Sequence, residues 1–358
     1  MIWNNKNKTI IMGKFVADAT RSEKLQKEQE FFDKDFLMSY SGLNKLTFSP
    51  SAFYKHYVLG QKEDSYDKNM IEGSLIHCLL LNPETFNDNF VISVNDLPSD
   101  NPRSVLHTVF NHYKELKAHG DERENLEDFS EAILDVLKDI NLYQSLKTDG
   151  QRIEKMVNSK HDEYWEYLKK SEGRTVIDDD TYTFCKAVVE KITSTSTVMD
   201  VMGFFADSFS PVEKFNEIVL VKFADTYPFG LRGIIDNLVI DHSKKEIRVN
   251  DLKKTSKTIT QFTDSIEYFN YWIQAAMYKK LVEHIYTSQE KYKDYSIVFR
   301  FLVADPFMQI APIKISDETM SKWTEKTDKL LEEASFHFNE RNFELPYCFI
   351  SNNNELEI

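Results

Sequence analysis

The stretch that most constrains this chain of 358 residues is a predicted β-hairpin that carries two aspartates and a lysine. Residues 231–240 and 246–253 alternate apolar and polar side chains and contain many β-branched residues, which is typical of half-buried strands. The polar run between them predicts a turn centred between Ser243 and Lys244, which pairs residues whose numbers sum to 487. Asp236 and Asp251 then face each other, with Cβ atoms roughly 5 Å apart.

Two opposed carboxylates require compensation, because like charges directly across a sheet destabilise it. The pair therefore predicts a bound proton, a cationic side chain or a metal ion. Lys253 follows Asp251 by two residues and lies on the same face of the strand. An acidic residue two positions before a lysine, as in Asp251-Leu-Lys253, is weak evidence by itself, because Glu115-Leu-Lys117 shows the same pattern in a region predicted to be helical. Together, the three positions predict a divalent-cation site beside a basic side chain.

The segments around the hairpin predict an α/β core. Residues 217–223 have the alternation of a preceding strand, and residues 295–304 and 309–315 predict two following strands. Helices are expected over residues 68–81, 178–194, 269–286 and 316–341. The first of these presents Gly73 and His77 one turn apart, although a single histidine there is more often a residue at the edge of a core than a ligand.

The helix predicted over residues 269–286 has two faces. Phe269, Trp272, Ala276 and Leu281 are expected to face the core, and for Trp272 we expect core packing alone. Gln274 and Tyr278 lie one turn apart on a second face, close to the end of the hairpin in sequence. This helix therefore predicts two polar side chains beside the carboxylates.

Charge is distributed unevenly along the chain. The net charge is −14, yet residues 244–280 contain eight basic and four acidic side chains. A basic strip on an acidic protein favours a polyanion that binds at one place, and solvated lysines around a turn are the alternative. We expect Arg232, Lys254, Thr255 and Lys257 to contact such a polyanion.

The sequence predicts one domain over residues 38–350, with a helical insertion at about 100–200, a polar arm over 1–37 and a tail over 351–358. Three scattered cysteines cannot supply a four-thiolate iron–sulfur or zinc site. The N-terminus lacks the pattern of a signal peptide, and no apolar run approaches eighteen residues. We therefore expect a cytoplasmic protein, in the host cytoplasm if it is viral, with no membrane contact.

In chain order, the pattern is Gly73-x-x-x-His77, Gly233-Ile-Ile-Asp236, Asp251-Leu-Lys253 and Gln274-x-x-x-Tyr278. Predicted elements and motifs together resemble the PD-(D/E)XK nuclease core, an αβββαβ arrangement with a central mixed sheet flanked by helices. Within that superfamily the chain resembles the RecE-type exodeoxyribonuclease VIII family and, more broadly, RecB-like and lambda-type exonucleases. Five segments carry this closer resemblance: Ser39-Tyr-Ser-Gly-Leu43, Phe48-Ser-Pro50, Asp251-Leu-Lys-Lys-Thr255, residues 271–278 and residues 341–347.

The resemblance implies a set of roles. Asp236, Asp251, the main-chain carbonyl of Leu252 and His77 would bind Mg²⁺ or Mn²⁺. Lys253 would orient water or stabilise charge on the phosphate, and Glu217 would have a supporting role only. Gln274 and Tyr278 would position the nucleotide or Lys253.

The implied activity is exonucleolytic digestion of linear double-stranded DNA from an end, in the 5′-to-3′ direction. It would produce single strands for phage-type recombination or repair. The implied partners are DNA ends and a single-strand annealing protein, and the implied assembly is a ring-like homo-oligomer. Four alternatives remain: an endonuclease, a nuclease of RNA or single-stranded DNA, a non-catalytic nucleic-acid-binding module and a structural metal protein.

Overall fold

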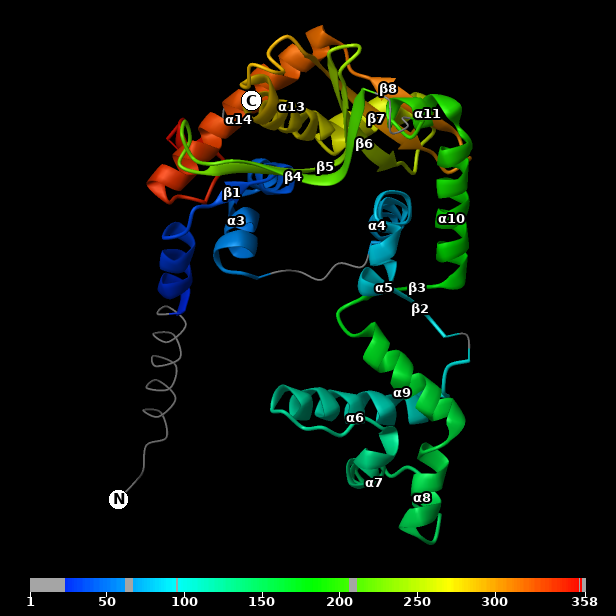
Figure 1. Ribbon diagram of the computed structural model, residues 1–358. Coiled ribbons are helices and arrows are strands. Elements are labelled where there is room, and N and C mark those ends of the chain that lie inside the picture. The colour runs from blue at the N-terminus through cyan, green and yellow to red at the C-terminus, as the bar shows by residue number, and fades with distance from the viewer. Residues whose placement is uncertain (1–22, 62–66, 95, 206–210, 354, 356–358) are drawn as a thin grey trace, which may run out of the picture. The chain divides into compact units, whose positions relative to one another are not determined.

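The computed structural model of the protein describes residues 23–61, 67–94, 96–205, 211–353 and 355. The chain divides into two compact units, one formed by residues 1–73 and 188–358 and the other by residues 74–187 (Figure 1). The predicted domain boundaries stay a prediction. Parts of the predicted arm and tail, residues 1–22, 354 and 356–358, lie outside the described residues.

The first unit contains a mixed sheet of six strands. Its strand order is β1-β5-β6-β7-β8, and β4 pairs with the other edge of β5. β4, β5 and β6 form an antiparallel meander, β7 runs parallel to β6, and β8 is antiparallel to β7. The bounds are β1 Leu37–Met38, β4 Val212–Lys222, β5 Gly230–Asp241, β6 Glu246–Lys254, β7 Ser296–Ala304 and β8 Ile310–Lys314. The predicted mixed sheet flanked by helices is confirmed.

The predicted hairpin register is also confirmed. Every β5–β6 pair, from Asn237 with Asn250 to Asp241 with Glu246, has residue numbers that sum to 487. The ladder ends at Asn237, and β1 takes over pairing with β5 at Gly230 and Leu231. β5 therefore leaves β6 at the point where the two aspartates come opposite each other.

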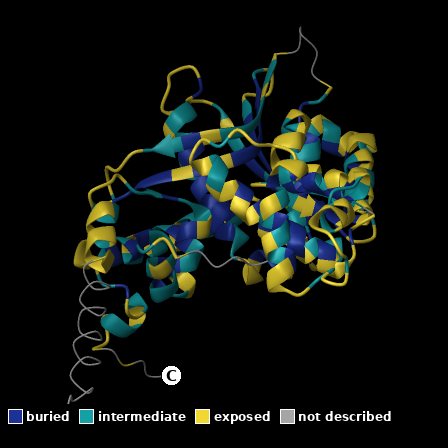
Figure 2. Cartoon of the chain, turned by 90° about the horizontal axis from the view of Figure 1, so that it is seen from below, coloured by how far each residue is buried: buried dark blue, intermediate teal, exposed yellow. Residues whose placement is uncertain are grey.

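Helices cover both faces of this sheet (Figure 1). α13 packs against β4, β5 and β7, and α14 packs on α13 and on α2. α11 lies against β8, and its C-terminal carbonyls accept hydrogen bonds from polar side chains of β5 and β6. The bounds are α2 Tyr40–Phe48, α3 Pro50–Phe53, α4 Lys68–Leu81, α11 Ser196–Val201, α12 Phe262–Tyr268, α13 Tyr271–Val282, α14 Asp317–Glu340 and α15 Tyr347–Ile350. Figure 2 shows how the buried residues gather along the strands and the helix faces packed on them.

Serine caps begin the first two helices, because a serine side chain satisfies a main-chain N–H that has no helical partner. Ser39 accepts a hydrogen bond from the N–H of Gly42, and Ser49 accepts one from that of Ala52. These caps fix where α2 starts and therefore where Tyr40 lies.

The second unit is mainly helical. α6, α7 and α9 pack around a separate apolar core that includes Trp165, whose indole N–H donates to the carbonyl of Glu124. A short parallel pair, β2 with β3, completes it. The bounds are α5 Phe86–Asn89, β2 Phe90–Ile92, α6 Asp100–Ala118, α7 Ser130–Asp139, α8 Asp149–Met156, α9 Ser159–Ser171, β3 Thr175–Ile177 and α10 Asp179–Ser194. α4 enters this unit from the first, and α10 leaves it.

The predicted helix over residues 269–286 is interrupted at its start. α12 ends at Tyr268, and α13 begins at Tyr271 after Asn270 takes a left-handed φ of 55°. Trp272, Ala276 and Leu281 are buried as predicted. The prediction for Phe269 is wrong, since its side chain is 47% exposed. The periodic pattern continues through the break, so periodicity alone could not reveal it.

No helix among the residues that the structure describes combines the length and the apolarity needed to cross a membrane.

Gly233 is required by close packing between β5 and α13. A Cβ atom there would lie 2.7 Å from Cε1 of Tyr278 and 3.0 Å from Cδ1 of Leu281. We predict that Gly233→Ala lowers the free energy of unfolding by about 1–3 kcal/mol, as overpacking of a core does. Gly150→Ala is the matched control, because Gly150 lies in α8 and an added Cβ would meet nothing within 4 Å. Chemical denaturation measures both variants, and equal stability of the two would contradict the packing argument.

Candidate active site

Three adjacent strands place carboxylates in one row. The β4–β5 register pairs Asn216 with Asn237 and Ile218 with Ile235, so Glu217 lies opposite Asp236. A carboxylate oxygen of Glu217 is within 4.8 Å of one of Asp236. The hairpin register, continued by one residue, places Asp251 opposite Asp236 on the other side. β4, β5 and β6 thus each contribute one acidic residue to the same row.

Asp236 stands where the β5–β6 ladder ends. Its side chain is 7% exposed, and its Oδ2 accepts a hydrogen bond of 2.7 Å from the N–H of Leu252. A side-chain oxygen therefore takes up a main-chain donor beyond the last β5–β6 pair, as buried N–H groups require. This bond fixes the carboxylate of Asp236 relative to the main chain of β6.

Asp251 is fully buried, and two side chains contact its carboxylate. Nε2 of Gln274 donates to Oδ1 at 2.8 Å, and Nζ of Lys253 lies 2.5 Å from Oδ2. Nε2 of Gln274 also lies 3.0 Å from the hydroxyl of Tyr278, which donates to the carbonyl of Ile234 at 2.6 Å. α13 is therefore joined by hydrogen bonds to β6 and β5 at the candidate site.

The local charges fix the protonation of the lysine and the tyrosine. Burial acts to lower the pKa of Lys253, but Asp251 and Asp236 outweigh it and hold that pKa above its ordinary value. Burial, followed by the same two carboxylates, raises the pKa of Tyr278. At neutral pH the site therefore contains an ammonium group and a neutral phenol.

The donor set fits a hard divalent cation. Carboxylate and amide oxygens are the ligands that Mg²⁺ prefers, and the row supplies the carboxylates. Oε1 of Gln274 is buried and has no hydrogen-bond partner among the described residues, so an acceptor remains beside Asp251. Glu217, expected to have only a supporting role, lies as close to Asp236 as a shared ligand set requires.

His77 lies on α4 and is half-buried. α4 starts in the first unit, where Glu72 forms an ion pair with Lys254 of β6. His77 belongs to the part of the helix assigned to the second unit. Its role as a metal ligand stays a prediction.

The basic residues of the window 244–280 are all paired. Each of the eight has a carboxylate within 4.0 Å: Lys244, Lys245, Arg248, Lys253, Lys254, Lys257, Lys279 and Lys280. Lys254 contacts Glu72 and Asn69, and Thr255 is 5% exposed. Lys257 lies 3.5 Å from Asp264. Because ion pairing offsets these charges locally, the window carries less free positive charge than its composition suggests.

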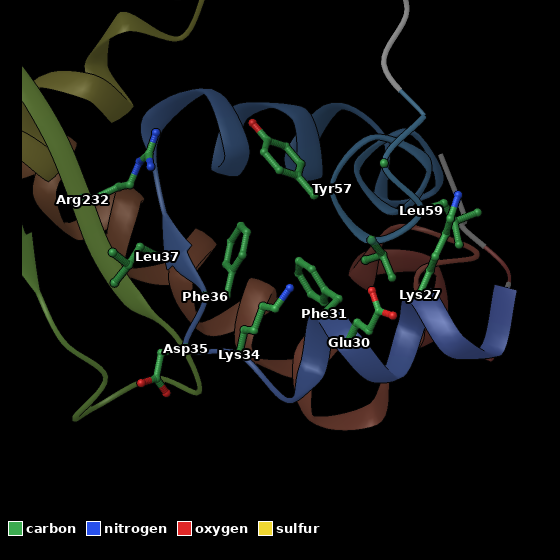
Figure 3. A pocket seen from close by; sticks show the side chains of 12 residues that line it. Lys27, Glu30, Phe31, Lys34, Asp35, Phe36, Leu37, Tyr57, Leu59 and Arg232 are labelled. Atoms are coloured by element: carbon green, nitrogen blue, oxygen red, sulfur yellow. The ribbon is translucent and has the colours of Figure 1, made fainter. Parts of the chain in front are cut away.

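Arg232 is exposed on β5 and lines a pocket of about 580 Å³ in the first unit (Figure 3). Lys27 and Lys34 also line it, and among the described residues none of these three cations has a carboxylate within 4.0 Å. Glu30 and Asp35 line the pocket too, which leaves one excess positive charge. Figure 3 shows the amine of Lys34 beside the rings of Phe31 and Phe36. The pocket thus combines unpaired cations with aromatic surface.

The site includes two tyrosines that the sequence analysis assigned no role. The ring centroid of Tyr271 lies 4.8 Å from Nζ of Lys253, and the rings of Tyr40 and Tyr271 are 6.4 Å apart. Burial raises the pKa of Tyr40, as do Tyr271 and Asp251. Tyr40 is part of the quoted Ser39-Tyr-Ser segment, so the resemblance was the available signal. Nothing in the local sequence indicates that Tyr271 covers the lysine.

We predict that Asp251→Asn destabilises the protein, because it leaves the ammonium of Lys253 without its main counter-charge. Removing one partner of a buried ion pair costs about 3 kcal/mol or more. The double variant Asp251→Asn, Lys253→Met should recover much of that loss, since the unpaired charge is gone. Urea denaturation without added metal measures both, and a single variant as stable as the wild type would contradict the assigned pairing.

Comparison with known proteins identifies the superfamily of the chain. The PD-(D/E)XK nuclease superfamily model matches residues 37–348, which include every residue of the candidate site. No protein of curated function matches the chain at a significant level. A solved structure from Eubacterium rectale, described as that of a candidate exonuclease, is similar at 12% identity with a TM-score of 0.44. That similarity covers 100% of this chain and 95% of the other.

Proteins of this superfamily are hydrolases that cleave phosphodiester bonds and depend on divalent metal ions. The row of carboxylates, the adjacent lysine and the mixed sheet agree with that assignment. The match covers most of the chain, and the chain belongs to the PD-(D/E)XK nuclease superfamily.

Proposed function

We propose that the protein is an exonuclease that digests linear double-stranded DNA from an end, in the 5′-to-3′ direction, and so supplies single strands for phage-type recombination or repair. The carrying observation is the row of Glu217, Asp236 and Asp251 with Lys253 beside it. Such a row can hold a metal ion against a substrate phosphate. In a module that only binds nucleic acid, opposed carboxylates would repel the polyanion and weaken binding.

We propose Mg²⁺ or Mn²⁺ as the cofactor. Asp236, Asp251 and Glu217 would hold it, with the main-chain carbonyl of Leu252 and His77 as further ligands. A bound ion of this kind polarises the scissile phosphate and lowers the pKa of coordinated water. Oxygen ligands suit both ions, and a histidine ligand makes Mn²⁺ acceptable.

Lys253 would act on the reacting phosphate. Its ammonium remains charged because the carboxylates raise its pKa, and it lies at the end of β6 beside Asp251. In this position it would stabilise charge that develops on the phosphate or orient the attacking water. Gln274 and Tyr278 would hold Asp251 and β5 in position through their hydrogen bonds.

The DNA strand would follow β5 from Asp236 towards Arg232. Residues 232, 234 and 236 alternate onto one face of the strand, and four residues span at most roughly 13 Å. At about 3.4 Å of rise per nucleotide this distance corresponds to about four stacked nucleotides. Arg232, with Lys27 and Lys34, would contact a phosphate there. Lys254, Thr255 and Lys257, also expected to contact DNA, lie at the end of β6 and directly after it, just beyond Lys253.

We further propose a ring-like homo-oligomer that encloses the duplex and works with a single-strand annealing protein in the cytoplasm. The acidic net charge and the paired lysines give one protomer a weak hold on DNA, which enclosure would offset. Light scattering should then give a mass several times 42.0 kDa.

Cleavage of end-labelled linear duplex and of closed circular DNA tests the function. Wild-type protein should degrade the linear form in Mg²⁺, leave the circle intact, and stop when the metal is chelated. Asp236→Asn should lose nearly all activity, since it removes a charge from the metal-binding row. Equal cleavage of the circle would indicate an endonuclease, and faster cleavage of RNA or single strands would indicate a different substrate. DNA binding without cleavage in any metal would indicate a non-catalytic module.

Arg232→Ala tests the proposed strand path. The variant should bind duplex ends more weakly, and its affinity should depend less on salt, by about 0.9 in the log–log slope for one lost phosphate contact. Lys322→Ala is the matched control, because Lys322 is a well-exposed cation on α14 whose partner is Glu318. If both variants show the wild-type slope, DNA does not follow β5 to this pocket.

A further inference from the structure

A series of aromatic rings leads from the catalytic lysine to exposed surface. Nζ of Lys253 lies 4.8 Å from the ring centroid of Tyr271. The ring of Tyr271 stacks on Phe269 with centroids 5.4 Å apart, and Phe269 meets Tyr268 edge-on at 4.8 Å. The outer two side chains are 47% and 78% exposed, respectively. The two exposed rings touch each other and continue a series of rings from the site, and contiguous exposed apolar surface marks binding sites more often than isolated side chains do.

The turn that carries these rings is held firmly. The hydroxyl of Tyr40 donates to the carbonyl of Phe269 at 2.5 Å, and Nδ2 of Asn44 donates to the same carbonyl at 3.4 Å. Nδ2 of Asn270 donates to Oδ1 of Asn44 at 2.9 Å. α2 therefore fixes the α12–α13 turn, and Asn270 adopts the left-handed conformation that ends one helix and starts the next. Rigid rings lose little entropy when a ligand stacks on them.

We propose that Phe269 and Tyr268 form a stacking platform for an unpaired nucleobase next to the scissile phosphate. The proposal rests on the proposed nuclease function and adds a substrate feature to it. The site would engage DNA whose last base pairs have opened, with one flanking base stacked on the platform while its phosphate lies near Lys253. Inside a duplex the bases present only their edges to a protein, and only the terminal pair exposes a face. A base further in that stacks on the platform must therefore be unpaired.

The surroundings favour a nucleobase over a protein segment. The series begins at the ammonium group of Lys253, beside the row of carboxylates. These groups suit a phosphate and a metal ion better than a protein segment. Proteins that bind single strands combine cationic side chains with aromatic side chains on which bases stack. Stacking on aromatic rings such as Phe269 and Tyr268 tolerates any base, because every base has a π face, and an exonuclease requires this tolerance.

Fluorescence of a base analogue tests the platform. Asp236→Asn protein in Mg²⁺ would bind, without cutting, a duplex with a short overhang that carries 2-aminopurine at its first unpaired position. Stacking should quench the probe, and adding Phe269→Ala and Tyr268→Ala should abolish the quenching. Affinity for the overhang duplex should fall by at least about fivefold, the lower end for the loss of one stacked base. Affinity for a blunt duplex that cannot open should change less.

Two further variants serve as controls. Phe205→Ala removes an aromatic side chain that is 63% exposed. It lies in the turn after α11, whose Gly203 packs on Val239, far along β5 from Arg232. This variant should leave quenching and affinity unchanged. Phe269→Trp should restore the quenching. Because both platform residues are exposed, circular dichroism should show the same fold in all variants.

The possible failures can be told apart. Wild-type cleavage of linear DNA together with unchanged quenching in the platform variant overturns the platform and leaves the nuclease function standing. Equal loss of affinity for blunt and overhang duplexes also overturns the platform. A lower oligomeric mass in the platform variant, with unaltered DNA binding, identifies the rings as a protein contact and overturns it as well. Absence of both cleavage and DNA binding in the wild type rejects the proposed function itself.

Discussion

The carboxylate of Asp251 is the group on which the site depends. It lies fully inside the protein, where an unpaired charge would be strongly destabilising. The hydrogen bond that Gln274 donates to one oxygen and the ammonium of Lys253 beside the other offset that cost. The same glutamine contacts Tyr278, which reaches across to β5. One buried negative charge therefore fixes the positions of a helix and two strands, and Gly233 provides the space that this arrangement needs.

Much of this could be predicted from the sequence, because the relevant constraints are local. A turn between Ser243 and Lys244 sets the hairpin register by itself, so the approach of Asp236 and Asp251 follows from counting. The spacing of Gln274 and Tyr278 is one helical turn, which places both on one face. The break between α12 and α13, in contrast, could not be predicted from local sequence. Tyr40 and Asn44, more than two hundred residues earlier, fix the intervening turn, and no local pattern records that contact.

The electrostatic prediction shows a second limit of sequence reasoning. Residues 244–280 have a surplus of basic side chains, but their carboxylate partners come partly from outside the window, as with Glu72, Asp294 and Asp328. Conversely, Lys27 and Lys34 lie 205 and 198 residues before Arg232 and line the same pocket. Charge counted along the chain differs from charge met by a ligand whenever the fold brings distant segments together. Of the three pocket cations, which have no carboxylate within 4.0 Å in the described part of the chain, the sequence indicated a binding role for Arg232 alone.

Glu217 has a left-handed φ of 49° in the middle of β4, between two residues that pair normally with β5. A side chain at this conformation costs roughly 1–2 kcal/mol relative to an ordinary strand residue, whereas glycine adopts it freely. A glutamate at this position is thus a poor choice for stability alone. Directed evolution for heat resistance, without a demand for cleavage, would be expected to replace it with glycine or asparagine. The thermostable proteins recovered would keep the sheet but lose one carboxylate of the row, so activity has to be selected alongside stability.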